Sequence, residues 1–276
     1  MPTENPTSGP SLSVLVSSCD SYSDLWPYFF HFFFSTWRSP SVPVSLLANH
    51  MHYADQRVRT IPVGRDVDWS ANLQRALQSV HSEYLILILE DFFFATPVDE
   101  ERVLDACRQL HRIGGKYLAL DQFGDTGDLV PGTDFRVSGG DDNLHAGLNL
   151  SLWRTDFLRE IAQPGKNIWR AESALRARNR AHEPGIYYMQ TGTTPIFTYC
   201  ESVRGVFWKQ HALDFLASHG LRPNLRRRPC PDQSDSKLAR MCRSMHKRRM
   251  KIASWLRTQM VMRGIGSRVQ PLRQAG

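Results

Sequence analysis

Long apolar runs and paired cysteines are both lacking in this sequence of 276 residues. The most apolar stretch, residues 25–37, has 13 residues, whereas a helix needs about 20 to span a membrane, so we expect no transmembrane helix. The five cysteines are scattered, without the two-residue spacing of zinc or redox pairs. Residues 1–10 lack the basic flank and apolar run of a signal peptide. We therefore expect a cytoplasmic protein with free thiols.

The charge is unevenly distributed. The whole chain has a formal net charge of +7, yet residues 222–276 contain 15 Lys or Arg against two Asp, which leaves a net charge of −6 on the preceding 221 residues. A hydrophobic content of 41% is typical of a folded globular protein. We therefore expect a flexible leader at 1–10, one catalytic-size domain at 11–221 and a basic tail at 222–276.

Apolar segments of strand length alternate with helical patterns between residues 11 and 200. Residues 84–89 are uniformly apolar, as in the central strand of a parallel sheet. The alternation, with its short links, predicts an α/β fold: a Rossmann-like, mostly parallel sheet flanked by helices. The expected strands are 11–16, 40–48, 57–63, 84–89, 117–120, 148–153, 186–189 and 197–199, and the expected helices are 24–37, 68–80, 99–113, 154–161 and 169–179.

Two adjacent acids, Glu90 and Asp91, end the central strand. Ligands of open α/β sheets bind beyond the carboxyl ends of the strands. Neighbouring carboxylates at such a place repel each other, and a divalent cation that neutralises them can also bind a diphosphate. The alternative is that the acids only cap the segment that follows or form a surface pair.

Residues 68–73 (Asp-Trp-Ser-Ala-Asn-Leu) and 84–92 (Tyr-Leu-Ile-Leu-Ile-Leu-Glu-Asp-Phe) resemble the core signature of GT-A glycosyltransferases. Residues 17–22 look like the first nucleotide-contacting loop of that family, and residues 169–172 (Trp-Arg-Ala-Glu) are similar to its acceptor-side motif. The resemblance covers about residues 12–210 and is strongest to transferases of bacterial surface-polysaccharide clusters. It implies a GT-A fold and transfer of a sugar from a nucleotide-diphosphate donor to a glycan or glycolipid acceptor.

The resemblance implies a metal site at the acidic pair. Asp91 is expected to bind the metal or the diphosphate side, with Glu90 as second ligand or as partner of the donor ribose, and His211 as a third ligand. The divalent metal would be Mn²⁺ or Mg²⁺. The Asp-x-Asp motif of the family is not literally present, because an aromatic residue follows the two acids, so a metal-free variant stays open. His211 could also be an ordinary surface histidine.

The same resemblance implies nucleotide contacts. Ser18, Asp20 and Tyr22 are expected to contact the nucleoside, and Asn72 the sugar or the ribose. Alternatively, Asp20 caps the aromatic helix that follows, and Asn72 makes a structural hydrogen bond.

Glu172 is the expected catalytic base, because an inverting transferase needs a carboxylate that takes the proton of the acceptor hydroxyl. Trp169, three residues earlier, would stack on a sugar. Asp142, or its neighbour Asp141, in the glycine-rich loop at 138–143 could act instead. The structural alternative is that Glu172 is a first-turn acid favoured by the helix dipole.

Residues 236–262 combine Lys and Arg with Leu, Met, Ile and Trp at helical spacing. This pattern predicts a cationic amphipathic helix on an anionic membrane, peripheral to its inner face and near a lipid-linked acceptor. A nucleic-acid patch or a solvated tail are the alternatives, but no nucleic-acid motif accompanies the charge, so nucleic acid is not an expected partner.

Two other functions fit parts of the pattern. A sugar-phosphate nucleotidyltransferase also uses such a sheet and a metal, but that family has a glycine-rich basic loop after its first strand, and residues 17–24 contain neither Gly nor Lys. A non-catalytic peripheral membrane adaptor would bind no nucleotide at all.

Overall fold

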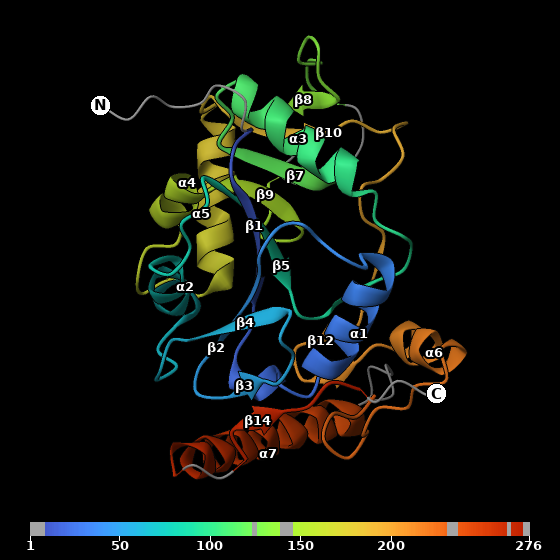
Figure 1. Ribbon diagram of the computed structural model, residues 1–276. Coiled ribbons are helices and arrows are strands. Elements are labelled where there is room, and N and C mark those ends of the chain that lie inside the picture. The colour runs from blue at the N-terminus through green and yellow to red at the C-terminus, as the bar shows by residue number, and fades with distance from the viewer. Residues whose placement is uncertain (1–8, 123–125, 139–145, 231–236, 264–265, 273–276) are drawn as a thin grey trace.

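A mixed sheet of eight strands forms the centre of the protein (Figure 1). The computed structural model describes residues 9–122, 126–138, 146–230, 237–263 and 266–272. The strands, in sheet order, are β4 (Val58–Pro62), β2 (Val44–Ala48), β1 (Leu12–Ser17), β5 (Tyr84–Leu89), β9 (Ser151–Arg154), β7 (Tyr117–Gln122), β10 (Ile186–Met189) and β8 (Phe135–Val137). The first four are mutually parallel, as are β7 and β10, whereas β9 and β8 run antiparallel to their neighbours. The predicted α/β class with a mostly parallel sheet is confirmed.

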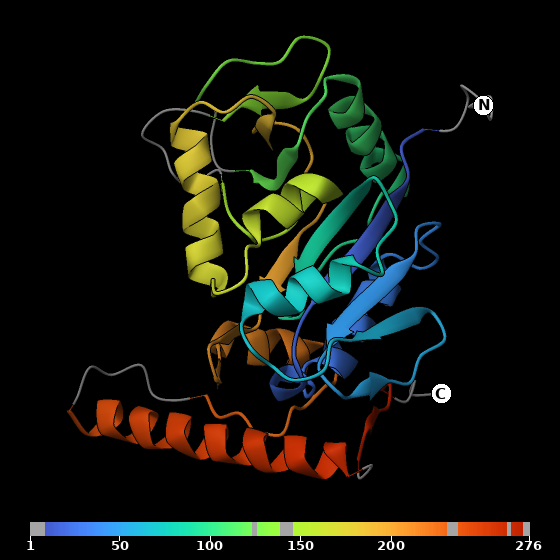
Figure 2. The ribbon, with the colours of Figure 1, turned by 90° about the vertical axis from the view of Figure 1, so that its left-hand side faces the viewer.

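Helices cover both faces of the sheet (Figures 1 and 2). On one face lie α1 (Trp26–Thr36) and α3 (Glu100–Arg112), and on the other α2 (Trp69–Leu77), α4 (Thr155–Ile161) and α5 (Ile168–Arg180). Alternate residues of β1 enter the two cores: Val14 and Val16 pack with α1, and Leu15 packs with α2. Burial on both faces explains why the central strands are apolar throughout.

Shorter elements complete the end of the sheet at which β5 stops. The antiparallel pairs are β6 (Phe92–Phe94) with β11 (Tyr199–Glu201) and β12 (Val203–Arg204) with β13 (Phe207–Trp208). A 3₁₀ turn, η1 (Asp20–Tyr22), follows β1, and α6 (Gln210–Ser218) follows β13. The strand expected at 197–199 overlaps β11 only at Tyr199, and the other strands of these two pairs carry too little periodicity for the sequence to predict them.

The basic segment is attached to the body on both sides of its helix, α7 (Lys237–Met262), which crosses one end of the molecule (Figure 2). Before α7, Arg228 is only 1% exposed, and the amide of Trp208 donates to the carbonyl of Pro229 at 3.0 Å. After α7, β14 (Arg268–Val269) pairs in parallel with β3 (His52–Tyr53). The boundary expected at residue 222 therefore does not coincide with a break in packing. Among the described residues, no helix is long and apolar enough to cross a membrane.

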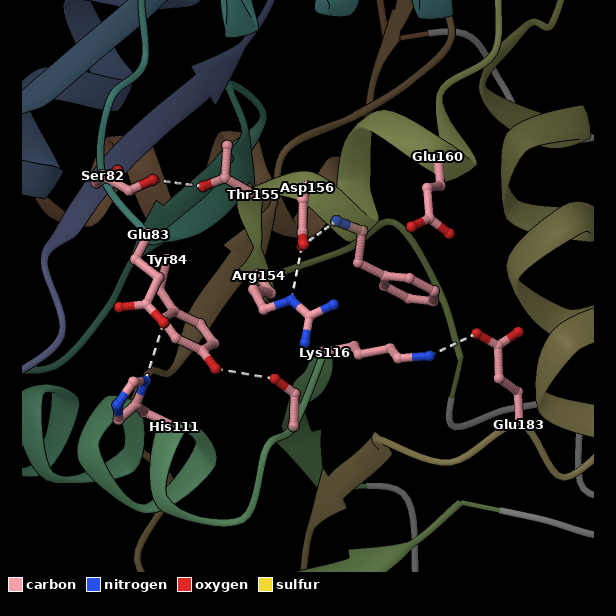
Figure 3. A network of polar contacts seen from close by, with 12 residues as sticks. Ser82, Glu83, Tyr84, His111, Lys116, Arg154, Thr155, Asp156, Glu160 and Glu183 are labelled. Carbon is pink, nitrogen blue, oxygen red and sulfur yellow. Dashed lines mark hydrogen bonds and ion pairs between the residues drawn. The ribbon is translucent and has the colours of Figure 1, made fainter.

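A polar network lies where β5 begins, at the opposite end of the strand from Glu90 (Figure 3). The hydroxyl of Thr155 donates to the carbonyl of Ser82 at 2.8 Å, and Lys116 forms an ion pair with Glu183, also at 2.8 Å. These contacts join α4 and the start of β7 to their neighbours. One contact joins a side chain to the backbone and the other joins two side chains, and both stabilise this end of the sheet.

Candidate active site

A cleft of about 970 Å³ opens at the carboxyl ends of β1 and β5. Its walls come from segments far apart in the sequence: the loop after β1, the start of α2, the turn after β5, the start of α5 and the β12–β13 hairpin. The structure brings together six of the predicted site residues in this lining: Ser18, Tyr22, Asn72, Glu90, Asp91 and Glu172.

Glu90 and Asp91 form the turn between β5 and β6. The turn is held on both sides, because β5 is paired with β1 and β6 with β11, and the carbonyl of Asp91 accepts a hydrogen bond from the amide of Ser202 at 2.8 Å. Glu90 is 7% exposed. The two acids therefore have fixed positions at the floor of the cleft.

Burial raises the pKa of both acids. For Glu90 the second cause is the charge of Asp91, and for Asp91 it is the charge of Glu201. Arg228 opposes the rise at both residues, and Lys209 opposes it at Asp91. A buried acidic pair with raised pKa values gains from any cation that neutralises it.

The metal site at Glu90 and Asp91 stays a prediction. The described residues contain no group of three His, Cys, Asp or Glu side chains arranged to hold a metal ion. His211, the predicted third ligand, is exposed, and its Nε2 lies 2.9 Å from the carbonyl oxygen of Glu201, outside the cleft lining; that prediction is corrected. The two carboxylates of Glu90 and Asp91 fit a cation such as Mg²⁺, which commonly takes one or two carboxylates and completes its shell with water and substrate phosphate oxygens.

Two tryptophans fix the end of β1. The indole Nε1 of Trp26 donates to the hydroxyl of Ser18 at 2.8 Å, and that of Trp69 donates to Ser17 at 3.0 Å. Tyr22 lines the cleft, and its hydroxyl donates to the carbonyl of Gly205 at 3.2 Å. The predicted nucleoside contacts Ser18 and Tyr22 are thus both at the cleft wall.

Asp20, the third predicted nucleoside contact, has a different role. Its buried carboxylate accepts hydrogen bonds from the backbone amides of Asn49 and His50 at 2.9 and 3.0 Å, and from that of Met51 at 3.2 Å. It does not line the cleft. These hydrogen bonds connect η1 to the loop after β2. The prediction that Asp20 contacts the nucleoside is therefore corrected. The alternative, that Asp20 caps the following helix, does not hold either.

Asn72 faces a further acid that the sequence did not single out. Its Nδ2 donates to Asp66 Oδ1 at 2.6 Å, and both residues line the cleft. Asp68 caps α2 by accepting from the amide of Ala71 at 2.8 Å and also accepts from the amide of Gly165 at 3.1 Å. Asp68 thereby joins the start of α2 to the loop that precedes α5.

The start of α5 forms another part of the cleft wall. Trp169 is 73% exposed at the cleft, and Glu172 lies one turn further on, in an ion pair with Arg176 at 3.2 Å. A Cβ added at Gly147 would lie 3.1 Å from Glu172 Oε1, so a glycine allows the chain to pass close to this carboxylate. The alternative base Asp142, with Asp141, falls outside the described residues.

Cations from the last part of the chain were missed by the sequence analysis. Arg204 and Lys209, at the β12–β13 hairpin, line the cleft, and Lys209 is ion-paired with Glu201. Arg228 lies behind them: its Nε and Nη2 each donate to Asp24 at 3.2 Å, and its Nη1 donates to the carbonyl of Gly205 at 3.0 Å. In the sequence Arg228 belongs to a run of three arginines, which reads as part of a solvated tail.

The guanidinium of Arg228 also packs on a residue of the cleft wall. Its carbon lies 4.8 Å from the centre of the Tyr22 ring, a cation–π contact. Arg228 thus connects Asp24, the Tyr22 ring and the hairpin turn at Gly205.

No protein-family model and no curated protein matches this sequence. Solved structures of similar fold include residues 1–349 of TarS from S. aureus, with 12% identity and a TM-score of 0.43 over 66% of this chain and 59% of that chain. Glucosyl-3-phosphoglycerate synthase from Mycobacterium tuberculosis, in complex with Mn²⁺ and UDP-glucose, has 12% identity and a TM-score of 0.46 over 82% and 81%. The 4-diphosphocytidyl-2C-methyl-D-erythritol synthase from Anaerococcus prevotii has 10% identity and a TM-score of 0.45 over 78% and 100%. These likenesses are of fold alone.

Proposed function

We propose that this chain is a glycosyltransferase of the GT-A type, which moves a sugar from a nucleotide-diphosphate donor to a glycan or glycolipid acceptor. One observation carries the proposal: the acidic turn Glu90–Asp91, at the end of the central strand, lines the same cleft as Glu172 and the exposed Trp169. A charged donor and a carbohydrate acceptor can therefore meet in one cavity.

The donor half of the site is assigned to the walls near β1 and β5. Tyr22 and Ser18 contact the nucleoside, and Asn72 contacts the ribose or the donor sugar. Asp91 and Glu90 would hold a divalent cation, which would supply positive charge to the departing diphosphate. The cations Arg204 and Lys209 lie on the same cleft, where they favour the developing negative charge.

The acceptor half is assigned to the start of α5. The exposed ring of Trp169 offers a flat apolar face to a sugar, while the Glu172 carboxylate takes the proton of the attacking hydroxyl. Arg176, one turn further along α5, orients that carboxylate through the ion pair at 3.2 Å. Attack by the hydroxyl on the anomeric carbon then forms the glycosidic bond as the nucleoside diphosphate leaves.

Nucleotide-dependent stabilisation tests the proposal. We expect one nucleoside diphosphate to raise the melting temperature of the wild-type chain in the presence of Mn²⁺, and Asp91→Asn to abolish that rise. Asp105→Asn, which removes an exposed acid from α3, is the matched control and should behave as wild type. A wild-type chain indifferent to every nucleotide would instead support a non-catalytic adaptor, and release of pyrophosphate during turnover would indicate a nucleotidyltransferase.

We further propose that α7 attaches the enzyme to the inner face of an anionic membrane, beside a lipid-linked acceptor for surface-polysaccharide synthesis. Several large apolar side chains of α7 are exposed, and Val261 is buried against the body. With about 100° between successive residues, the exposed residues fall mainly on the side opposite Val261, next to Arg248 and Arg249. The exposed apolar residues of α7 are Met245, Ile252, Trp255, Leu256, Met260 and Met262.

Vesicle flotation tests the membrane contact. Ile252→Glu combined with Leu256→Glu should abolish binding to vesicles that contain anionic lipid, since it puts two negative charges on the apolar side. Nucleotide-dependent stabilisation should stay unchanged, because neither residue lines the cleft. Equal flotation of the variant and the wild type would contradict this part of the proposal.

A further inference from the structure

A second cavity, of about 370 Å³, lies apart from the cleft. It is open to solvent and is lined by the start of α1, the segment that precedes α7 and the strand β14 that follows it. None of its lining residues belongs to the lining of the larger cleft. The cavity therefore has walls of its own, built where the two attachments of the basic segment meet the body.

The lining has an excess of positive charge. Asp24 is its single carboxylate, and this carboxylate already binds two guanidinium groups: Arg227 at 3.1 Å and, from behind the wall, Arg228 at 3.2 Å. Arg268, from β14, is the second arginine that lines the cavity. The arginines at this cavity thus carry more positive charge than the single negative charge of Asp24 can neutralise.

Trp208 adds a buried hydrogen-bond donor. The residue lines the cavity and is 3% exposed, and its Nε1 has no hydrogen-bond partner among the described residues. Buried indole N–H groups usually have a partner. An unsatisfied donor beside an excess of arginine indicates that an anion with acceptor oxygens completes this cavity.

We propose that this second cavity binds a phosphate ester. Guanidinium groups match phosphate oxygens in pairs, so Arg268 and Arg227 bind the phosphate while Trp208 Nε1 donates to one of its oxygens. Met51, Val269 and Leu272, which also line the cavity, contact the organic part of the ligand. The phosphate comes either from a lipid headgroup, which the adjacent α7 would bring near, or from a soluble phosphate ester.

Calorimetric titration with inorganic phosphate, at constant ionic strength, tests the site on the full chain. Arg268→Gln should weaken phosphate binding on the order of tenfold, as expected for the loss of one charge-assisted contact. Trp208→Phe, which keeps an aromatic ring but removes the donor, should weaken it as well. Arg38→Gln, at an exposed arginine outside both cavities, is the matched control and should not change it. Phosphate affinity that is absent, or that is unchanged in Arg268→Gln, overturns the proposal.

Vesicles distinguish the two sources. Phosphatidylcholine vesicles with phosphatidic acid are compared with vesicles of equal charge that contain oleate in place of the phosphatidic acid. Stronger binding to the phosphatidic acid vesicles that is lost in Arg268→Gln identifies a lipid headgroup. Equal binding to both vesicles, together with Arg268-dependent binding of inorganic phosphate, identifies a soluble ester. Nucleotide binding in the larger cleft should stay intact in Arg268→Gln, so this test is independent of the proposed transferase activity.

Discussion

Two neighbouring arginines with the same chemistry have different surroundings. Arg228 is enclosed and makes three hydrogen bonds, two of them to Asp24, whereas Arg227 is partly exposed and pairs with the same carboxylate at 3.1 Å. The sequence alone does not show which of the two arginines is buried, because this depends on the path of the chain after α6. The difference has a measurable consequence for stability.

Replacing Arg228 by methionine should lower the free energy of unfolding by about 3 kcal/mol, because it leaves Asp24 short of its buried partner. Arg227→Met should cost about 1 kcal/mol or less, since a partly exposed pair is screened by solvent. Urea denaturation of both variants makes the comparison. Equal losses would show that burial of Arg228 contributes no stability.

Asp121, near the end of β7, makes the free energy of unfolding depend on pH. Burial raises its pKa to about 6, while the hydrogen bond from the Tyr199 hydroxyl, at 3.0 Å, acts in the opposite direction. Between about pH 4 and pH 6 the folded protein holds a proton that the unfolded chain releases, so this group lowers stability as the pH rises.

Asp121→Asn, which cannot ionise, should therefore gain stability relative to wild type as the pH rises from 4 to 6, by about 2 kcal/mol. Denaturation at several pH values measures the difference. Asp105→Asn, at an exposed position on α3, should leave the pH dependence unchanged. A constant offset between Asp121→Asn and wild type across this range would contradict the argument.

Most secondary-structure elements follow from the sequence because their periodicity is strong. The helix expected at 99–113 is α3, which begins after the cap Asp99, and the strand expected at 84–89 is β5 with the same bounds. β6 was not predicted, since its pairing with β11 joins residues about a hundred positions apart. The acidic pair was located correctly from the end of an apolar run. Asp66 and Lys209 were missed, because only the folded chain brings them to the cleft.

Helix caps provide a prediction at this scale. Asp68 caps α2 and also binds the amide of Gly165, whereas Asp99 caps α3 alone. Asp68→Ala should cost about 2 kcal/mol and Asp99→Ala about 1 kcal/mol, because the first also separates α2 from the loop before α5. Urea denaturation compares them, and hydrogen exchange should show faster exchange of the Gly165 amide in Asp68→Ala only. Unchanged protection of that amide would count against the second role of Asp68.

The whole molecule does not divide where its composition changes. A chain ending at residue 221 lacks Arg228 and the Pro229 carbonyl that binds Trp208, so we expect it to show no cooperative thermal transition. A chain ending at residue 230 keeps both contacts and loses β14 and Val261. It should unfold cooperatively at a lower temperature than the full chain, as followed by circular dichroism. If the two truncated chains melted similarly, the domain boundary at residue 222 that the composition indicates would be supported.

The two attachments of α7 have a consequence for the distance between the cleft and a membrane on which α7 rests. The chain contacts the body on both sides of this helix, through Arg228 before it and through β14 after it, so the helix differs from an anchor that is tethered at one end. If its outer side rests on a bilayer, the body stands at one height and one tilt above the lipid. On the proposed function, only acceptors whose free end extends to that height would meet Glu172, so the attachment of α7 would select acceptor length.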